Sequence, residues 1–154
     1  MKQVKEKVFA YITHITHGHR LLVFRHPAFP EVGIQVPAGT VKMDEHPERA
    51  VFREAFEETG LADLVLVSFL GEQTRDMSDC GCEEIHHRRF YHLYCPGNPP
   101  ETWFHEERDP SDGTSGPILF AFFWVPFPDG VPTLIADHGN MLPVLAHSLF
   151  HLYS

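Results

Sequence analysis

Three glutamates near the middle of the chain have the spacing at which side chains share one face of a helix. Glu54, Glu57 and Glu58 stand at positions i, i+3 and i+4, so on a helix their carboxylates lie side by side. Carboxylates placed in this way repel one another, and the arrangement makes physical sense if divalent cations occupy the face. Mg²⁺ and Mn²⁺ prefer oxygen ligands, and Mg²⁺ usually shares its coordination with waters and substrate phosphates. A solvated acidic helix face is the alternative interpretation.

Two neighbouring features can complete such a site. Arg53 lies next to the acidic stripe, where its guanidinium can brace the carboxylates through a bidentate ion pair. Gly39 and the preceding Pro37 and Ala38 form a tight loop. Such a loop can offer a backbone carbonyl as a further oxygen ligand, and we expect that carbonyl to be the one of Ala38.

The spacing of the whole segment resembles a known motif. Gly39 is followed after five residues by Glu45 and, after seven more, by the run from Arg53 to Leu61. This segment is similar to the Nudix box, G-x5-E-x7-R-E-U-x-E-E-x-G-U, in which U is an apolar residue. Every fixed position is filled, and Ala55 and Leu61 satisfy the apolar positions. The flanking elements extend the resemblance to the Nudix hydrolase family over nearly the whole chain.

The resemblance implies an α/β fold, a Nudix-type α/β/α sandwich with a mixed β-sheet between helices, in a single domain over residues 1–154. It also implies hydrolysis of a diphosphate bond in a nucleoside diphosphate linked to another moiety, with a metal-activated water attacking phosphorus. Mg²⁺ or Mn²⁺ is the implied cofactor. Carried over by position, the implied metal ligands are Glu54, Glu57 and Glu58. Arg53 is implied to orient them, and Glu45 to support them as a further carboxylate.

The general base stays open at this point. It is either a box glutamate, Glu54 or Glu57, or an acidic residue of a later segment. The later candidates are Glu83, Glu84, Glu106 and Glu107.

Two other classes of protein share such a fold. A catalytically silent nucleotide-binding or regulatory module is expected to have lost a box glutamate. An isomerase of isoprenoid diphosphates is expected to have a broken box and a catalytic cysteine. Here the box is whole, which favours the hydrolase.

Composition limits the partners. Twelve Lys and Arg stand against 21 Asp and Glu, a formal net charge of −9 at pH 7 with the 12 His neutral. A net negative charge of this size repels polymeric nucleic acid. A small-molecule nucleotide or other diphosphate substrate can still bind if divalent cations screen the acidic cluster. The longest apolar run, Ile118 to Val125, is too short to cross a membrane. A homodimer would fit the family, and nothing in the residues decides it.

The three cysteines, Cys80, Cys82 and Cys95, are too few and odd in number for a disulfide framework, which favours a reducing, cytoplasmic location. Zinc binding by Cys80, Cys82, His86 and His87 is a weak alternative, because paired zinc cysteines mostly have two to four intervening residues.

Several side chains outside the box can contact substrate. Arg25, Arg88 and Arg89 are suited to bind phosphate, and surface exposure is the alternative for each. Trp103 and Phe104 can stack on a nucleobase, although aromatic residues are more often core. His147 and His151 have the spacing of a metal-ligating helical pair, for which surface or packing roles are the stronger interpretation.

The elements that must position these residues follow from hydrophobic periodicity and turn residues. We expect a helix from Pro47 to Thr59, with Gly60 at its C-terminal cap and His46 at its N-cap, where Ser, Thr or Asp would cap better. A second helix is expected over residues 140–152. The expected strands cover residues 8–12, 21–24, 64–70, 89–95, 102–107 (an edge strand) and 118–125 (a central strand). The expected loops cover residues 26–40, 71–87 and 109–117.

Overall fold

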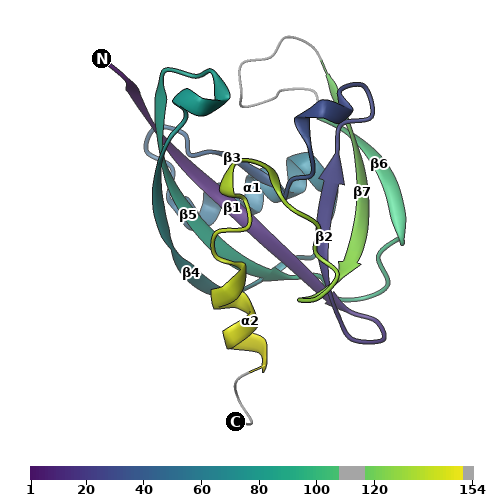
Figure 1. Ribbon diagram of the computed structural model, residues 1–154. Coiled ribbons are helices and arrows are strands. Elements are labelled where there is room, and N and C mark those ends of the chain that lie inside the picture. Colours follow the sequence, from purple (N-terminus) through teal and green to yellow (C-terminus); the bar gives the residue numbers. More distant parts are fainter. Residues whose placement is uncertain (108–116, 151–154) are drawn as a thin grey trace.

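The computed structural model describes residues 1–107 and 117–150. This part of the chain holds two α-helices and seven strands, besides three short 3-10 turns (Figure 1). In chain order they are β1 (Gln3–Ile15), β2 (His19–Arg25), β3 (Ala38–Thr40), α1 (Pro47–Thr59), β4 (Val65–Asp76), β5 (Glu84–Tyr94), β6 (Thr102–Glu107), β7 (Ile118–Pro126) and α2 (Leu142–Phe150).

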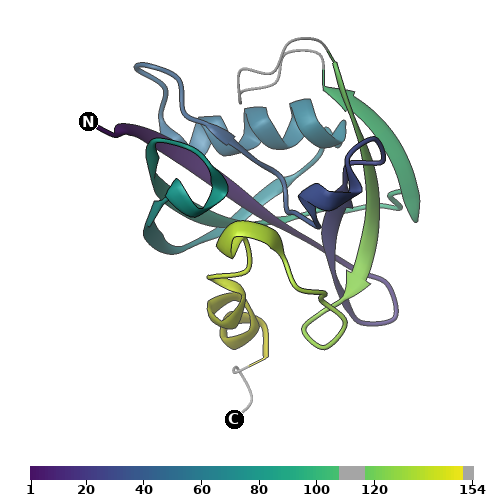
Figure 2. The ribbon, with the colours of Figure 1, turned by 45° about the horizontal axis from the view of Figure 1, so that its top comes forward.

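All seven strands belong to one mixed sheet. Its order is β4-β5-β1-β2-β7-β6, and β3 pairs with β1 beside this path. Strands β1 and β5 run parallel, whereas every other pair is antiparallel. Helix α1 covers one face of the sheet and α2 lies against the other (Figure 2). The expected α/β/α sandwich is confirmed.

Strand β1 divides the hydrophobic core into two layers, because successive side chains of a strand point to opposite faces. Val8, Ala10 and Ile12 pack in the cluster beneath α1. Phe9 and Tyr11 pack in the cluster that includes α2. The sheet therefore buries apolar residues on both faces and holds both helices.

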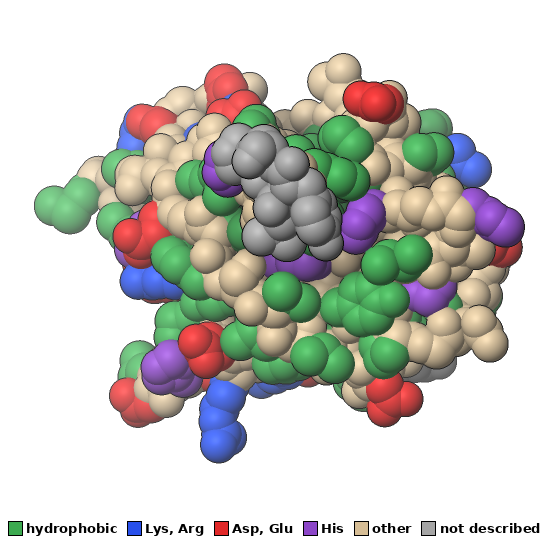
Figure 3. Space-filling view, turned by 90° about the horizontal axis from the view of Figure 1, so that it is seen from below, with side chains coloured by type: hydrophobic (Ala, Val, Ile, Leu, Met, Phe, Trp, Pro, Cys, Tyr) green, Lys and Arg blue, Asp and Glu red, His purple; other side chains and the backbone are tan. Residues whose placement is uncertain are grey.

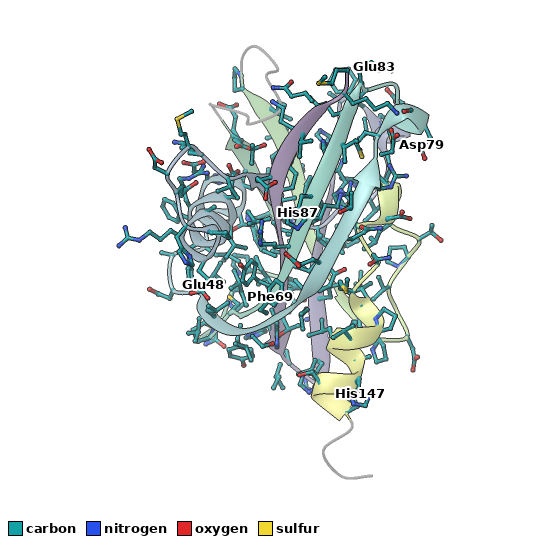
Figure 4. All side chains as sticks on the ribbon, turned by 90° about the vertical axis from the view of Figure 1, so that its left-hand side faces the viewer. Glu48, Phe69, Asp79, Glu83, His87 and His147 are labelled. Carbon is teal, nitrogen blue, oxygen red and sulfur yellow. The ribbon has the colours of Figure 1, made fainter. Side chains whose placement is uncertain are left out.

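The expectation of a polar loop over residues 71–87 is wrong for most of that segment. Strand β4 continues to Asp76 and β5 begins at Glu84, so the two strands form a long antiparallel pair at the sheet edge. Polar residues are tolerated there because an edge strand has few neighbours to pack against. Figure 4 looks onto this edge, with Phe69 labelled on β4, His87 on β5, and the two helices on either side.

The other predicted strands and loops are partly confirmed and partly corrected. Within residues 26–40, Ala38–Thr40 forms β3 rather than loop, because its backbone pairs with β1. The strand over residues 102–107 lies at the other edge, and β7 lies between β2 and β6, as expected. The loop at 109–117 falls, apart from its last residue, outside the described residues. So do the last two residues of the helix expected over 140–152.

Helix α1 is bounded as predicted. The His46 ring Nδ1 accepts a hydrogen bond of 3.4 Å from the Glu48 N–H, and Gly60 adopts the left-handed conformation, with its N–H bonded to the Phe56 carbonyl. Val51 and Ala55 are buried against the sheet, whereas Phe52 and Phe56 are exposed. The sheet-facing side of the helix runs through residues 51, 54, 55 and 58, so it carries two of the box glutamates into the protein.

Neither helix in the described ranges is long and apolar enough to cross a membrane. Figure 3 shows the end of the molecule seen from below, where acidic and a few basic side chains are scattered among hydrophobic ones rather than gathered in a basic patch.

His92 on β5 makes the fold sensitive to acid. The residue is 2% exposed, its Nε2 lies 2.7 Å from Thr13 Oγ1, and burial lowers its pKa from 6.5 to about 4. A lowered histidine pKa means that the unfolded chain binds the proton more readily. Its contribution to stability is therefore present above pH 6.5 and is lost as the pH falls toward 4.

We expect this residue to account for about 2 kcal/mol of the stability lost between pH 7.5 and pH 4.5. Chemical denaturation of the wild type and of His92→Gln at both pH values measures the contribution as a difference. Equal losses in the two proteins would contradict it.

Candidate functional site

The acidic face of α1 is partly buried. Glu54 and Glu58 are 2% and 7% exposed, because they share the sheet-facing side of the helix with Val51 and Ala55. Glu57 stands at the rim, with its side chain 39% exposed. A solvated acidic helix face would leave all three carboxylates exposed to water. The burial of Glu54 and Glu58 therefore favours a metal site over that alternative.

Arg53 joins the box carboxylates. Its Nε and Nη2 bind the two oxygens of Glu45 at 2.8 and 2.9 Å, a bidentate pair. Its Nη1 donates to Glu54 at 2.8 Å and to Glu57 at 3.2 Å. Nη2 also donates to the Thr40 carbonyl at 3.0 Å. One guanidinium thus holds three carboxylates and the adjoining backbone in fixed positions.

The bidentate pair also fixes the charge states of its two members. The hydrogen bonds from Arg53 lower the pKa of Glu45 to about 2, and those to Glu45 and Glu54 raise the pKa of Arg53. Both groups are therefore ionised at neutral pH.

A fourth carboxylate joins the cluster from a distant part of the chain. Oxygen atoms of Glu54, Glu57 and Glu107 all lie within 4.8 Å of one another. Glu107 ends β6 and is 5% exposed. Among the later acidic candidates, Glu106 is exposed, Glu83 is exposed and Glu84 binds His86 at 2.9 Å. Glu107 is the one that the fold brings to the box.

The donor set fits a divalent cation. Oε2 of Glu54 is buried and accepts no hydrogen bond from any described residue. Burial raises the pKa of Glu54, and burial together with the charge of Glu107 raises the pKa of Glu58 well above its usual range. Carboxylates this crowded need a counter-charge to ionise together, and oxygen ligands suit Mg²⁺ and Mn²⁺.

The backbone of β3 turns toward the same cluster. The Pro37 carbonyl and the Val41 N–H bond to β1. Between them, the Ala38 N–H donates to Glu58 at 3.1 Å and the Thr40 carbonyl accepts from Arg53. The N–H and carbonyl of one residue in a strand point to the same side, so the Ala38 carbonyl lies on the side of the carboxylates.

Gly39 lies so close to Glu54 that no side chain fits between them. A Cβ at this position would lie 2.0 Å from Cδ and 2.2 Å from Oε2 of Glu54. Because Glu54 is 2% exposed, its side chain cannot move without displacing packed neighbours.

We expect Gly39→Ala to displace the Glu54 carboxylate and to lower the free energy of unfolding by about 1–3 kcal/mol. Turnover should be mostly lost with it. Chemical denaturation and an activity assay check this, and a variant with the stability and turnover of the wild type would contradict the packing argument.

A pocket of about 180 Å³ opens beside the acidic cluster. Glu58 and Glu107 line its acidic side, and Lys7 and Arg88 line it as well. Its aromatic lining is Phe9, Phe24 and Phe120. Lys7 and this lining were missed by sequence reasoning, since they come from three strands, β1, β2 and β7, that only the pairing of the sheet brings together beside the box. Lys7 donates to Thr40 Oγ1 at 2.7 Å.

The three arginines proposed for substrate binding lie in different places. Arg88 lines the pocket and is 1% exposed. Arg89 points to the opposite face and binds Glu6 at 2.8 Å. Arg25 is exposed, with its guanidinium 5.4 Å from the ring centre of Phe123. Only Arg88 of the three lines the pocket.

The aromatic and zinc candidates lie apart from the cluster. Trp103 stacks on Phe122 and donates to the Thr59 carbonyl at 2.9 Å, whereas Phe104 is exposed. Cys80 and Cys82 are exposed. Within the described residues, the group of side chains that could hold a metal ion is Glu54, Glu57 and Glu107, and it includes no cysteine or histidine.

The histidines singled out from the sequence do not join the acidic cluster, although His86 lines the adjoining pocket. His86 binds Glu84, and His87 lies between Glu6 and Glu72 at 2.9 and 3.1 Å. His147 is exposed on α2 (Figure 4), and His151 lies outside the described residues.

Known proteins share this architecture. A model of the NUDIX domain matches residues 6–145. A MutT NUDIX hydrolase from Burkholderia pseudomallei is similar, with 23% identity, a TM-score of 0.64 and coverage of 94% of this chain and 99% of that one. The NUDIX domain of Shewanella oneidensis NrtR, complexed with ADP ribose, has 14% identity, a TM-score of 0.66 and coverage of 97% and 90%. An Ap4A hydrolase from C. elegans has 14% identity, a TM-score of 0.64 and coverage of 94% and 97%. A comparison with curated protein sequences gave no match.

Because the family model spans most of the chain, the protein belongs to the NUDIX family. Its complete box and its fold are those of a NUDIX-type hydrolase.

Proposed function

We propose that the protein hydrolyses a diphosphate bond in a nucleoside diphosphate linked to another moiety, with Mg²⁺ or Mn²⁺ as cofactor. The observation that carries this proposal is the convergence of Glu54, Glu57 and Glu107 within 4.8 Å, with an oxygen of Glu54 buried and without a hydrogen-bond donor in the described ranges. The adjoining pocket provides room for a small molecule.

The residues have distinct roles in this proposal. Glu54, Glu57 and Glu58, with the Ala38 carbonyl, hold the cation, and Glu107 joins them from β6. A divalent ion supplies charge neutralisation for the diphosphate and activation of water at such a site. Arg53 keeps the carboxylates oriented, and Glu45 keeps Arg53 in place. A carboxylate of the cluster accepts the proton of the attacking water, and Glu54, Glu57 and, of the later acidic residues, Glu107 are the candidates for this base.

The experiment is a chromatographic assay of the purified protein with a panel of diphosphates, before and after metal removal. The panel holds nucleoside triphosphates, ADP-ribose, NADH, dinucleoside polyphosphates, sugar nucleotides and coenzyme A. We expect cleavage of at least one compound with Mg²⁺ or Mn²⁺, complete loss with chelator, and recovery when metal is added back. Activity that persists with excess chelator would overturn the metal-dependent mechanism.

A nucleotide-binding module without turnover is the second candidate. It is favoured by the similarity to the NrtR domain in complex with ADP ribose. Folded, metal-loaded protein that binds a nucleotide and cleaves no compound of the panel would support it over the hydrolase.

We also propose a reducing, cytoplasmic location and a small-molecule partner. The free thiols of Cys80, Cys82 and Cys95 support the location, and the pocket beside the acidic cluster supports the partner.

A further inference from the structure

The wall of the pocket holds a guanidinium without a carboxylate partner among the described residues. Arg88 projects from β5 and is 1% exposed. Its Nη1 donates to the Ala136 carbonyl at 2.6 Å, its Nη2 contacts the Met77 sulfur at 3.5 Å, and the Phe9 ring centre lies 4.8 Å from its central carbon. Its Nε is buried and has no acceptor in the described ranges.

The buried positive charge of Arg88 is not paired with an anion of the described residues. A guanidinium offers five donors in a fixed fork, and burying it without an anion costs free energy. Burial lowers the pKa of Arg88 to about 10. The charge of Asp137 favours the ionised form. That carboxylate, however, is bound by Arg75 at 3.0 Å, and Arg75 adds a repelling positive charge.

The neighbouring His138 ring offers Arg88 no negative charge. His138 accepts the Val36 N–H on its Nδ1 at 3.2 Å, and burial lowers its pKa to about 3. The neutral ring therefore carries its proton on Nε2. The carboxylates that line the pocket are Glu58 and Glu107, and both belong to the acidic cluster. Among the described lining residues the cations are thus Lys7, which donates to Thr40, and Arg88, which has no carboxylate partner.

We propose that the Arg88 wall is a subsite for a second oxyanion group of the substrate, a phosphate or a carboxylate outside the diphosphate that is cleaved. This inference rests on the proposed function, because the acidic cluster is taken as the place of the diphosphate. The planar fork of arginine matches the geometry of either oxyanion. The substrate is then held at two charged points, and the added group supplies the counter-charge that Arg88 lacks.

The test uses three pairs of diphosphate compounds that differ in one oxyanion. They are dephospho-coenzyme A and coenzyme A, NADH and NADPH, and UDP-glucose and UDP-glucuronate. The first two pairs add a phosphate and the third a carboxylate, so the pairs distinguish the two sources. We expect the wild type to prefer the oxyanion-bearing member of at least one pair by about tenfold or more in kcat/KM.

The variants assign that preference to the guanidinium. Arg88→Met should abolish it, mainly through KM, and Arg88→Lys should keep part of it. Arg89→Met is the matched control, because this neighbour on β5 points to the opposite face, and it should keep the preference. Circular dichroism checks folding. If Arg88→Met does not fold, Arg88→Lys decides: an unchanged preference in that variant overturns the proposal.

A binding measurement separates the subsite from turnover. Calorimetric titration with inorganic phosphate, in excess chelator, should show binding to the wild type and none to Arg88→Met. Absent or equal binding overturns the subsite, as does turnover without an Arg88-dependent preference in any pair. A changed selectivity between guanine and adenine nucleotides instead would assign Arg88 to a neutral base edge and also overturn it. Arg88-dependent phosphate binding without cleavage of any compound would support the subsite and contradict the hydrolase.

Discussion

Replacing Glu57 by glutamine will lower turnover by about two to four orders of magnitude and leave the fold intact. Glu57 stands at the rim of the acidic cluster, where its side chain is 39% exposed. The amide keeps the size of the side chain and can still accept the hydrogen bond that Arg53 donates at 3.2 Å. It loses the negative charge, and a neutral amide oxygen is a weaker ligand for a divalent ion than a carboxylate and cannot accept a proton as a base. The assay is kcat/KM on the best substrate of the panel.

Glu48→Gln is the matched control for this change. Glu48 lies on the same helix, in the first turn, and is exposed outside the cluster (Figure 4). The Glu48→Gln variant should retain the activity of the wild type. Wild-type turnover in Glu57→Gln, with metal affinity unchanged in a Mn²⁺ titration, would remove Glu57 from the proposed ligand set.

Replacing Arg53 by methionine will damage both stability and activity. Its guanidinium lies between Glu45, Glu54 and Glu57, and no other described side chain donates a hydrogen bond to these three carboxylates. Removing one partner of a largely buried ionic cluster costs about 3 kcal/mol. We expect a loss of that size in chemical denaturation, together with a loss of activity of about a hundredfold or more from misplaced carboxylates.

Arg53→Lys separates charge from geometry. Lysine keeps the positive charge but cannot bind Glu45 in a bidentate manner and reach the others at once, so it should regain stability more than activity. Arg49→Met, an exposed arginine one turn earlier on α1, should change neither. If Arg53→Lys had full activity, the fork geometry would be irrelevant to the site.

The box and its helix were predictable because their information is local. The spacing of Glu54, Glu57 and Glu58 depends only on the helical repeat, and Pro47 and Gly60 mark the helix ends. The buried side of the helix was harder to predict. Phe52 and Phe56 look like better core residues than Glu54 and Glu58, yet the sheet-facing side carries the glutamates. Hydrophobicity alone therefore misplaces a helix that must present charge to a site.

The rest of the site depends on pairing between distant segments. Glu107 was one of four later acidic candidates. The position of β6 beside β7 separates it from Glu83 and Glu84, and the alternation of the strand separates it from Glu106. Arg88 and Arg89 are indistinguishable in the sequence, because the alternation of a strand decides which of them enters the pocket. The strand pair of β4 and β5 could not be recognised from hydrophobicity. Its residues beyond Leu70 are mostly polar, and the two strands pair with one another through their backbones.

The threefold pairing of β1 has a consequence for the order in which the protein folds. Strand β1 pairs antiparallel with β2 and β3 and parallel with β5. The pairing with β5 extends from Gln3 with Glu84 to Thr13 with Tyr94. Loops must close over some eighty residues before this ladder exists, and such non-local pairing slows folding. Gly39 is held against Glu54 through this same strand. A peptide containing only the box would form some helix and no metal site, so during synthesis the cluster is assembled late, when the sheet closes.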